Sequence, residues 1–201
     1  MTKQVEYFMS PPSPYAYMGH DRFVAIAKAH DAEVVFKPFD IAKVFSVSGG
    51  LPVGQRSAQR QAYRLVELQR WSTHLNKKLN LQPAFFPVAG DPSAKLLIAA
   101  QAAHGTDTAL TLAGALGLAL WAEEKNIADA ETLAAIADSC GLPGQQLVAA
   151  SLTDSVAAIY LRNTEEAIAA QVFGVPWFRI DGENFWGQDR LEFVEQALAA
   201  A

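Results

Sequence analysis

Strand-like sequence is confined to the two ends of this 201-residue chain, and the stretch between them is helical. Near the start, residues 5–9 and 33–39 are short runs of β-branched and aromatic side chains, separated by a helical pattern over 14–30. Two strands joined through a helix need a crossover connection and therefore pair in parallel. Strand character returns only near the end, at 177–181 and 184–186. A last helix follows at 189–200. The two ends must therefore meet in one sheet.

Between these ends the apolar residues recur at helical spacing. The predicted helices are 57–79, 92–104, 108–125, 130–139, 143–151 and 153–171. Residues 41–52 contain serines and glycines and are predicted to form a loop. We expect an α/β protein with a discontinuous sheet domain, residues 1–45 and 172–201, interrupted by a helical insertion domain, residues 46–171.

Charge and cysteine content narrow the function classes. The net charge of −5 leaves no broad cationic surface for nucleic acid, and no run reaches the roughly 18 apolar residues of a membrane span. The single cysteine, Cys140, cannot form an internal disulfide or a cysteine-based metal cluster, and the four histidines lack metal-ligand spacing. With no signal-like start, the sequence predicts a cytoplasmic protein without metal, membrane or nucleic-acid partners.

Ser13 stands between the first strand and the first helix, and Pro14 occupies the favoured first helical position. The unpaired N–H groups and positive dipole end of a helix N-terminus lower the energy of an anion held beside Ser13. A thiolate brought in from outside would fit there, because Cys140 lies far along the chain. Alternatively, Ser13 is only a helix cap, and both roles can hold at once.

Three motifs together carry a family resemblance. They are Ser13-Pro14-Tyr15, Val172-Phe173-Gly174-Val175-Pro176 and Phe185-Trp186-Gly187-Gln188-Asp189-Arg190-Leu191. In this order they resemble the kappa-class glutathione transferases and the 2-hydroxychromene-2-carboxylate isomerases. That DsbA-like group has a thioredoxin-like fold with an inserted all-helical domain. The resemblance covers nearly the whole chain and implies glutathione as the cofactor.

The resemblance also implies roles for the first two motifs. Ser13 occupies the place where C-x-x-C begins in thioredoxin-like oxidoreductases, so dithiol exchange is impossible and the Ser13 hydroxyl would hydrogen-bond the glutathione sulfur. Val175-Pro176 resembles a cis-proline that faces this turn, with the Val175 main chain pairing to the cysteinyl part of glutathione. The alternative is an ordinary trans proline that opens a strand.

The third motif would hold the other end of glutathione. The N–H groups of Gln188 and Asp189 would receive the γ-glutamyl carboxylate, and the Asp189 carboxylate would pair with the α-ammonium. Trp186 and Gly187 would border this site, and Gln188 replaces a serine common in the family. The alternative is that Asp189 caps the last helix.

Cationic and aromatic residues are candidates for binding the substrate. Lys43, Arg56 and Arg60 could hold a substrate carboxylate, and Tyr15 and Phe45 could line a pocket for a flat bicyclic ring. Three places in this part of the chain depart from the family pattern, namely Gly50 for an asparagine, Arg60 for a lysine and Glu67 for an aspartate. Alternatively, the cations at positions 56, 60, 64 and 70 are a solvated helix face.

The expected function is glutathione-dependent isomerisation of a hydroxychromene carboxylate in aromatic hydrocarbon catabolism, with Ser13 as the catalytic residue. Two alternatives stay open. One is a kappa-class-like glutathione transferase or peroxidase, which would consume the thiol. The other is a non-catalytic peptide-binding module. Relatives of this kind are commonly dimers, so the resemblance implies a homodimer.

Overall fold

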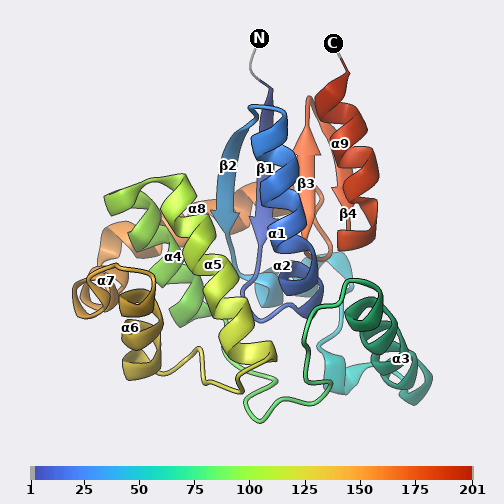
Figure 1. Cartoon of the computed structure of the whole chain (residues 1–201), viewed down its shortest axis with the longest axis horizontal. Coiled ribbons are helices and arrows are strands. Elements are labelled where there is room, and N and C mark those ends of the chain that lie inside the picture. The colour runs from blue at the N-terminus through green and yellow to red at the C-terminus, as the bar shows by residue number, and fades with distance from the viewer. Residues whose placement is uncertain (1–2, 201) are drawn as a thin grey trace.

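The computed structural model describes residues 3–200, in which one four-stranded sheet has the order β2-β1-β3-β4. β1 (Gln4–Met9) pairs in parallel with β2 (Glu33–Pro38) and antiparallel with β3 (Trp177–Ile180). β3 pairs antiparallel with β4 (Glu183–Trp186). The two ends of the chain therefore share one sheet, as the sequence predicts (Figure 1).

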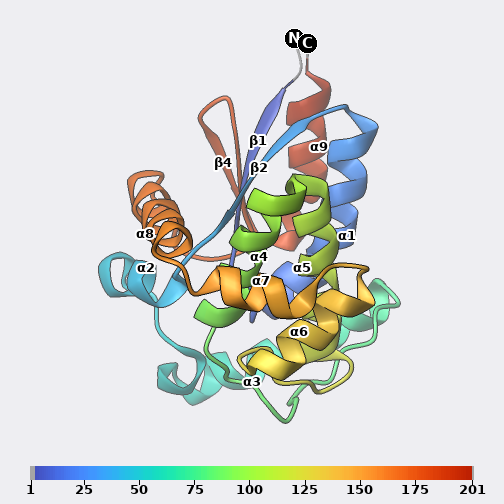
Figure 2. The same ribbon diagram turned by 90° about the vertical axis from the view of Figure 1, so that its left-hand side faces the viewer.

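The helices surround this sheet. They are α1 (Pro14–Ala29), α2 (Ile41–Ser48), α3 (Ala58–His74), α4 (Asp91–His104), α5 (Thr106–Trp121), α6 (Ala130–Ser139), α7 (Gly144–Ser151), α8 (Asp154–Ala169) and α9 (Leu191–Ala199), with short 3-10 turns η1 (Val53–Gln55) and η2 (Gln188–Arg190). Figure 2 shows α1 and α9 on one side of the sheet and α8 on the other. In Figure 1, α3 lies beyond the end of the sheet where α1 begins. None of the helices within residues 3–200 is long and apolar enough to cross a membrane.

One hydrophobic core cluster spans both the sheet and the helical part. Tyr7 of β1 stacks on Phe178 of β3 at a ring distance of 5.1 Å, and Phe23 of α1 packs on Phe178 at 4.6 Å. The same cluster of buried side chains continues into the helical part through Leu96 and Leu112. The division of the chain into two domains near residue 45 stays a prediction.

His20 joins α1 to β1 and to α5 inside this core. Its Nε2–H donates to the Leu110 carbonyl at 2.8 Å, which leaves Nδ1 to accept from the Tyr7 hydroxyl at 3.2 Å. Each ring nitrogen thus has a partner in the neutral state, and burial lowers the pKa of His20. These contacts fix the orientation of α1, whose N-cap is Ser13.

Residues 41–48 form helix α2, so the predicted loop is wrong there. The Asp40 carboxylate accepts hydrogen bonds from the N–H groups of Ala42 and Lys43 at 2.9 and 3.1 Å. Val44 is buried, and Gly49 ends the helix with a left-handed φ of 76°. The prediction gave weight to the serines and glycines and overlooked this cap.

Two predicted helices also end earlier than expected. α3 ends at His74 and not near residue 79, because the backbone turns left-handed at Asn76, with a φ of 48°. α5 ends at Trp121 and not at residue 125, and Glu124 beyond it has a φ of 55°. The other helices and the strands lie close to their predicted ranges.

Candidate functional site

The three sequence motifs meet at one end of the sheet. There β1 leads into α1, β3 begins and β4 leads into η2 and α9 (Figure 1). The pairing of β3 with β4 places Trp177 opposite Trp186. The pairing of β3 with β1 places Trp177 beside Phe8, just before the turn to Ser13. Residues more than 160 positions apart in sequence therefore share one location.

Ser13 caps α1. Its Oγ accepts a hydrogen bond from the Ala16 N–H at 3.1 Å, and its carbonyl accepts one from the Tyr17 N–H at 3.0 Å. Pro14 has no N–H, and the N–H of Tyr15, like other first-turn donors, has no intrahelical acceptor and no other partner among residues 3–200. Within the same residues the Ser13 hydroxyl proton is not donated to any acceptor. The cap thus leaves the hydroxyl able to donate to a ligand.

Val175 and Pro176 lie directly before β3, beside Trp186 of β4. The Val175–Pro176 peptide is cis, as the resemblance implied. Within the described part of the chain, the Val175 N–H and carbonyl make no hydrogen bond. The Trp186 indole lies so close to Gly174 that a side chain there would overlap it, and Phe173 packs edge-on against it at 4.6 Å. The free main chain of Val175 is therefore bordered by an indole that is half exposed.

Gly187 connects the end of β4 to η2. Its N–H donates to the Pro176 carbonyl at 2.9 Å, which fixes this turn to the cis-proline. Gly187 has a φ of 107°, a conformation that favours glycine, and a side chain there would overlap the Asp189 carboxylate. As far as the structure describes the chain, the N–H groups of Gln188 and Asp189 have no partner. Two adjacent donors are thus available at the start of η2.

The side chains of Gln188 and Asp189 point in different directions. Gln188 is buried, and its Oε1 and carbonyl oxygen accept from Arg22 Nη1 of α1 at 3.0 and 3.4 Å. Asp189 is exposed, and its carboxylate pairs with Arg190 at 2.8 Å. It makes no side-chain cap at η2 or α9, so the alternative in which Asp189 caps the last helix does not hold. We call Val175, Pro176 and Gly187–Asp189 the main-chain side of the site.

Tyr15 connects this region to α3. The residue is half buried, and burial raises the pKa of its hydroxyl. Arg64, Glu67 and Arg56 lie near enough to act on its charge, as does Asp189. Segments that the sequence analysis treated separately therefore converge on one tyrosine.

The remaining predicted substrate-binding residues are placed unequally. Arg56 Nε donates to the Leu51 carbonyl at 2.9 Å, and within residues 3–200 its side chain has no acidic partner. Lys43 on α2 and Arg60 in the first turn of α3 are exposed, and the structure shows no hydrogen bond or ion pair of theirs to Tyr15. Phe45 is half buried, with its ring against Gly50, where a side chain would overlap it. Of these four, only Arg56 acts on the pKa of the Tyr15 hydroxyl, which its charge lowers against the larger effect of burial.

Arg64 is a candidate that the sequence analysis missed, because it was considered only as part of a solvated helix face. It is 9% exposed and shares the inward face of α3 with Leu68. Its guanidinium carbon lies 5.1 Å from the Phe86 ring centre and 5.9 Å from that of Trp121. The i, i+4 spacing from Leu68 was the available signal, because residues four apart share one helix face.

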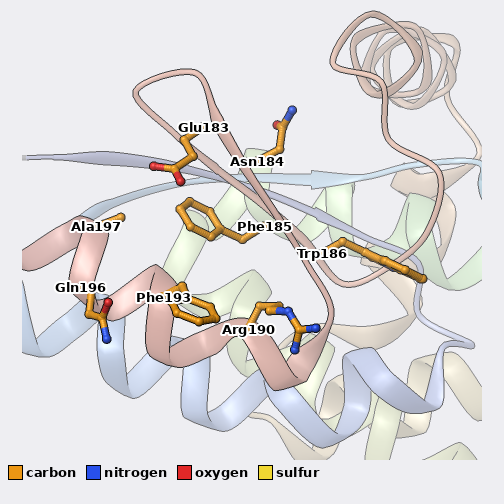
Figure 3. Close-up of a pocket in the computed structure, with 8 residues that line it drawn as sticks. All are labelled: Glu183, Asn184, Phe185, Trp186, Arg190, Phe193, Gln196 and Ala197. Atoms are coloured by element: carbon orange, nitrogen blue, oxygen red, sulfur yellow. The ribbon is translucent and has the colours of Figure 1, made fainter.

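A surface pocket of about 650 Å³ lies between β4 and α9 (Figure 3). Phe185 and Phe193 face it, whereas Trp186 extends away from Phe193 (Figure 3). Neither Ser13 nor Val175 lines this pocket. The pocket therefore lies next to the main-chain side, and Tyr15 does not line it. In the described residues no group of three or more histidine, cysteine or acidic side chains could hold a metal ion.

Comparison with known proteins agrees with this architecture. The DSBA-like thioredoxin domain family matches residues 4–199. The 2-hydroxychromene-2-carboxylate isomerase of Sphingobium xenophagum is 25% identical over 199 residues, which cover 98% of this chain and 99% of that protein.

Two solved structures extend the comparison. The structure of a 2-hydroxychromene-2-carboxylate isomerase superposes with a TM-score of 0.83 at 22% identity, covering 98% of this chain and 94% of that one. The cytosolic disulfide reductase DsbM from Pseudomonas aeruginosa with GSH gives a TM-score of 0.68 at 14% identity, covering 96% and 93%. The predicted thioredoxin-like fold is thereby confirmed.

Proposed function

This chain belongs to the DSBA-like thioredoxin domain family, and on that premise we propose that it is a glutathione-dependent isomerase of 2-hydroxychromene-2-carboxylate. The product would be the trans-o-hydroxybenzylidenepyruvate isomer, formed in aromatic hydrocarbon catabolism. The observation that carries the proposal is Ser13. It stands at the helix N-terminus where the oxidoreductases have a cysteine, and its hydroxyl proton is free.

The donors and acceptors around Ser13 fit a cysteine-containing tripeptide with a carboxylate and an ammonium at one end. The Val175 N–H and carbonyl would pair with the cysteinyl main chain, as an added strand does. The N–H groups of Gln188 and Asp189 would receive the γ-glutamyl carboxylate, and the exposed Asp189 carboxylate would take the α-ammonium. DsbM, which shares the fold, has a structure with GSH, and this supports the assignment.

When bound, glutathione supplies a thiolate that can add to an electrophilic carbon and leave again, so that a double bond can rotate. The chain's own residues prepare for this chemistry. The Ser13 hydroxyl and the Tyr15 N–H donate to a sulfur anion, and the positive end of α1 lowers its energy. Because the Ser13 cap accepts the Ala16 N–H at the same time, its hydroxyl is oriented before any ligand binds.

Removing the Ser13 hydroxyl tests the proposal. In Ser13→Ala we expect glutathione-dependent turnover of hydroxychromene carboxylate, followed spectrophotometrically, to fall about 10- to 100-fold, as for loss of a hydrogen bond to a charged group. Ser46→Ala, an exposed serine on α2, is the matched control and should keep full turnover. Full activity in Ser13→Ala would remove the assigned role.

Binding and stoichiometry separate the isomerase from other uses of this fold. Calorimetry should show saturable glutathione binding by the wild type and about tenfold weaker binding by Asp189→Ala, with Glu192→Ala as the control. Free thiol should remain constant during turnover. Net loss of thiol would indicate a kappa-class-like transferase or peroxidase, and binding of peptides without turnover would indicate a non-catalytic module.

We also propose that the protein acts in the cytoplasm as a homodimer on a small aromatic carboxylate, without nucleic acid or membrane partners. A reducing compartment would keep the glutathione thiol available, and the negative net charge disfavours nucleic acid. Exposed leucines on the helical part, Leu118, Leu152 and Leu161, offer apolar surface for a second copy. Light scattering after size-exclusion chromatography would give the mass directly.

A further inference from the structure

Arg64 is a buried cation without an anion. Its side chain makes no hydrogen bond or ion pair within residues 3–200, and its Nη2 is fully enclosed. A guanidinium is always charged at ordinary pH, so burial without an acceptor carries a desolvation cost. Each such group in a folded protein calls for an explanation, and a ligand that supplies the acceptor is one.

The surroundings of Arg64 hold the guanidinium without neutralising it. The faces of Phe86 and Trp121 support it at 5.1 and 5.9 Å. The Trp121 indole N–H is also buried without a partner, and these two donors are the buried unpartnered side-chain atoms of the described chain. Both donors lie in the cluster formed by Arg64, Phe86 and Trp121, so two donors without an acceptor are found in the same part of the structure.

Two further donors act on the charge of Arg64, namely Tyr15 of α1, which packs against the same core cluster as Phe86, and Arg56 just after η1. The Tyr15 hydroxyl makes no hydrogen bond within the described residues, and α1, on which it stands, packs against α3. The charge of Arg56 lowers the pKa of both Tyr15 and Arg64, and among residues 3–200 the Arg56 side chain has no carboxylate partner. Glu67, the nearby acid on α3, is already paired with Arg70. Two arginines and a hydroxyl thus act on one another, and none of the three is paired with a carboxylate among the described residues.

We propose that Arg64, together with Arg56 and the Tyr15 hydroxyl, forms a carboxylate-binding subsite beside the Ser13 turn. A planar guanidinium binds a carboxylate with two parallel hydrogen bonds, and the flanking aromatic rings hold its plane in place. The Phe86 ring, which is partly exposed, suits a carboxylate carried on an aromatic ring, whereas Trp121 is fully buried behind it. The identity of the carboxylate as that of the isomerase substrate rests on the proposed function.

The same chemistry has two possible sources. One is the carboxylate of the aromatic substrate, and the other is the glycyl carboxylate of glutathione. We assign the subsite to carboxylate binding and let the experiment distinguish the sources. The variant Arg64→Met keeps an unbranched, stackable side chain against the aromatic rings and removes the charge. Arg162→Met, at an exposed arginine of α8, is the matched control.

Three quantities should be measured for wild type and both variants: the KM for hydroxychromene carboxylate at saturating glutathione, the Kd for glutathione by calorimetry, and the melting temperature. A rise of about tenfold or more in KM for Arg64→Met, with the glutathione Kd unchanged, supports the subsite and assigns it to the substrate. A similar rise in the glutathione Kd alone supports it and assigns it to the glycyl carboxylate. Unchanged KM and Kd in folded Arg64→Met would overturn the proposal.

A probe of the wild type keeps the test independent of the variant's folding and of the isomerase activity. Salicylate and salicylamide have the same ring and differ in the carboxylate. Salicylate should bind at least about tenfold more tightly than salicylamide, as read by calorimetry in the presence of glutathione. Equal binding, or none, would reject the substrate carboxylate as the ligand, and together with an unchanged glutathione Kd in Arg64→Met it would overturn the subsite. Discrimination in a protein that does not turn over hydroxychromene carboxylate would keep the subsite and reject the proposed function.

Discussion

The main-chain side of the site and the arginine side, Arg56 and Arg64 with Tyr15, are built from different parts of the polypeptide. On the main-chain side the free donors are backbone N–H groups, placed by strand pairing and by the Gly187–Pro176 hydrogen bond. On the arginine side the donors are long side chains, Arg56 just after η1 and Arg64 on α3, and α3 lies beyond the end of the sheet (Figure 1). Ligand binding on the main-chain side therefore depends on the fold of the backbone, whereas ligand binding on the arginine side depends on which side chains are present.

This difference teaches where specificity can vary. A backbone N–H is present whatever residue supplies it, except proline, so a main-chain site tolerates exchanges such as serine for glutamine at position 188. A guanidinium is lost entirely with one substitution. We therefore expect changes in backbone conformation to weaken glutathione binding most. Substitution of the arginines should weaken only the binding of the carboxylate ligand that they hold.

The largest effect is expected from Gly187→Val. A branched side chain at a φ of 107° is strained and would displace Asp189, so glutathione affinity should fall at least about thirtyfold and stability by ~1–3 kcal/mol. Gly182→Val is the matched control, because Gly182 has a φ of 86° in the β3–β4 turn with nothing within 4 Å of the added carbon. It should lose stability and keep glutathione binding, as measured by calorimetry and urea unfolding. Equal losses of glutathione affinity in Gly187→Val and Gly182→Val would show that the backbone at Gly187 has no special role in binding.

An intermediate effect is expected from Arg56→Met. Its guanidinium is partly used by the Leu51 carbonyl, so the KM for hydroxychromene carboxylate should rise about three- to tenfold, less than for Arg64→Met. The glutathione Kd should stay within about twofold if the subsite takes the substrate carboxylate. A change confined to glutathione would instead place Arg56 with the glycyl carboxylate. Arg162→Met is again the control.

The smallest effect on binding is expected from Gln188→Ser. Because only the backbone N–H is assigned to glutathione, its Kd should change less than about threefold. Stability should nevertheless fall by ~1–2 kcal/mol, since Arg22 loses an acceptor at 3.0 Å. A double-mutant cycle with Arg22→Met, read by urea unfolding, isolates this pair. A tenfold loss of glutathione affinity would show that the Gln188 side chain contributes to binding. The main-chain side would then depend on side-chain identity as the arginine side does.

Much of the fold was predictable because it depends on periodicity. The strands at both ends and most of the helices follow from local patterns, and the meeting of the two ends follows from the need to complete a sheet. Residues 41–48 were misread because serine and glycine content was given more weight than the Asp40 cap. Local composition is a weaker signal than a capping residue followed by buried apolar positions.

The sequence predicted those parts of the site whose position is set by local backbone structure. It did not predict the part whose burial is set by tertiary packing. Ser13 and Gly187 stand at element boundaries that the sequence marks. Arg64 looks like any arginine of an exposed helix, and its burial depends on Phe86 and Trp121, which come from segments 22 and 57 residues further along. No local pattern reports such a contact. The nearest hint was the apolar stripe of α3 that includes Leu68.

The sheet order also determines when this site can form during synthesis. β1 is a central strand, yet its neighbour β3 begins only at Trp177. At ~5–20 residues per second, one edge of β1 waits roughly 10–30 s for its partner, open to wrong pairing with other chains. The Ser13 turn is made early and the Gly187–Asp189 turn among the last residues. A nascent or truncated chain can therefore display the capped serine, but it cannot hold a thiol ligand until nearly all of the polypeptide has been made.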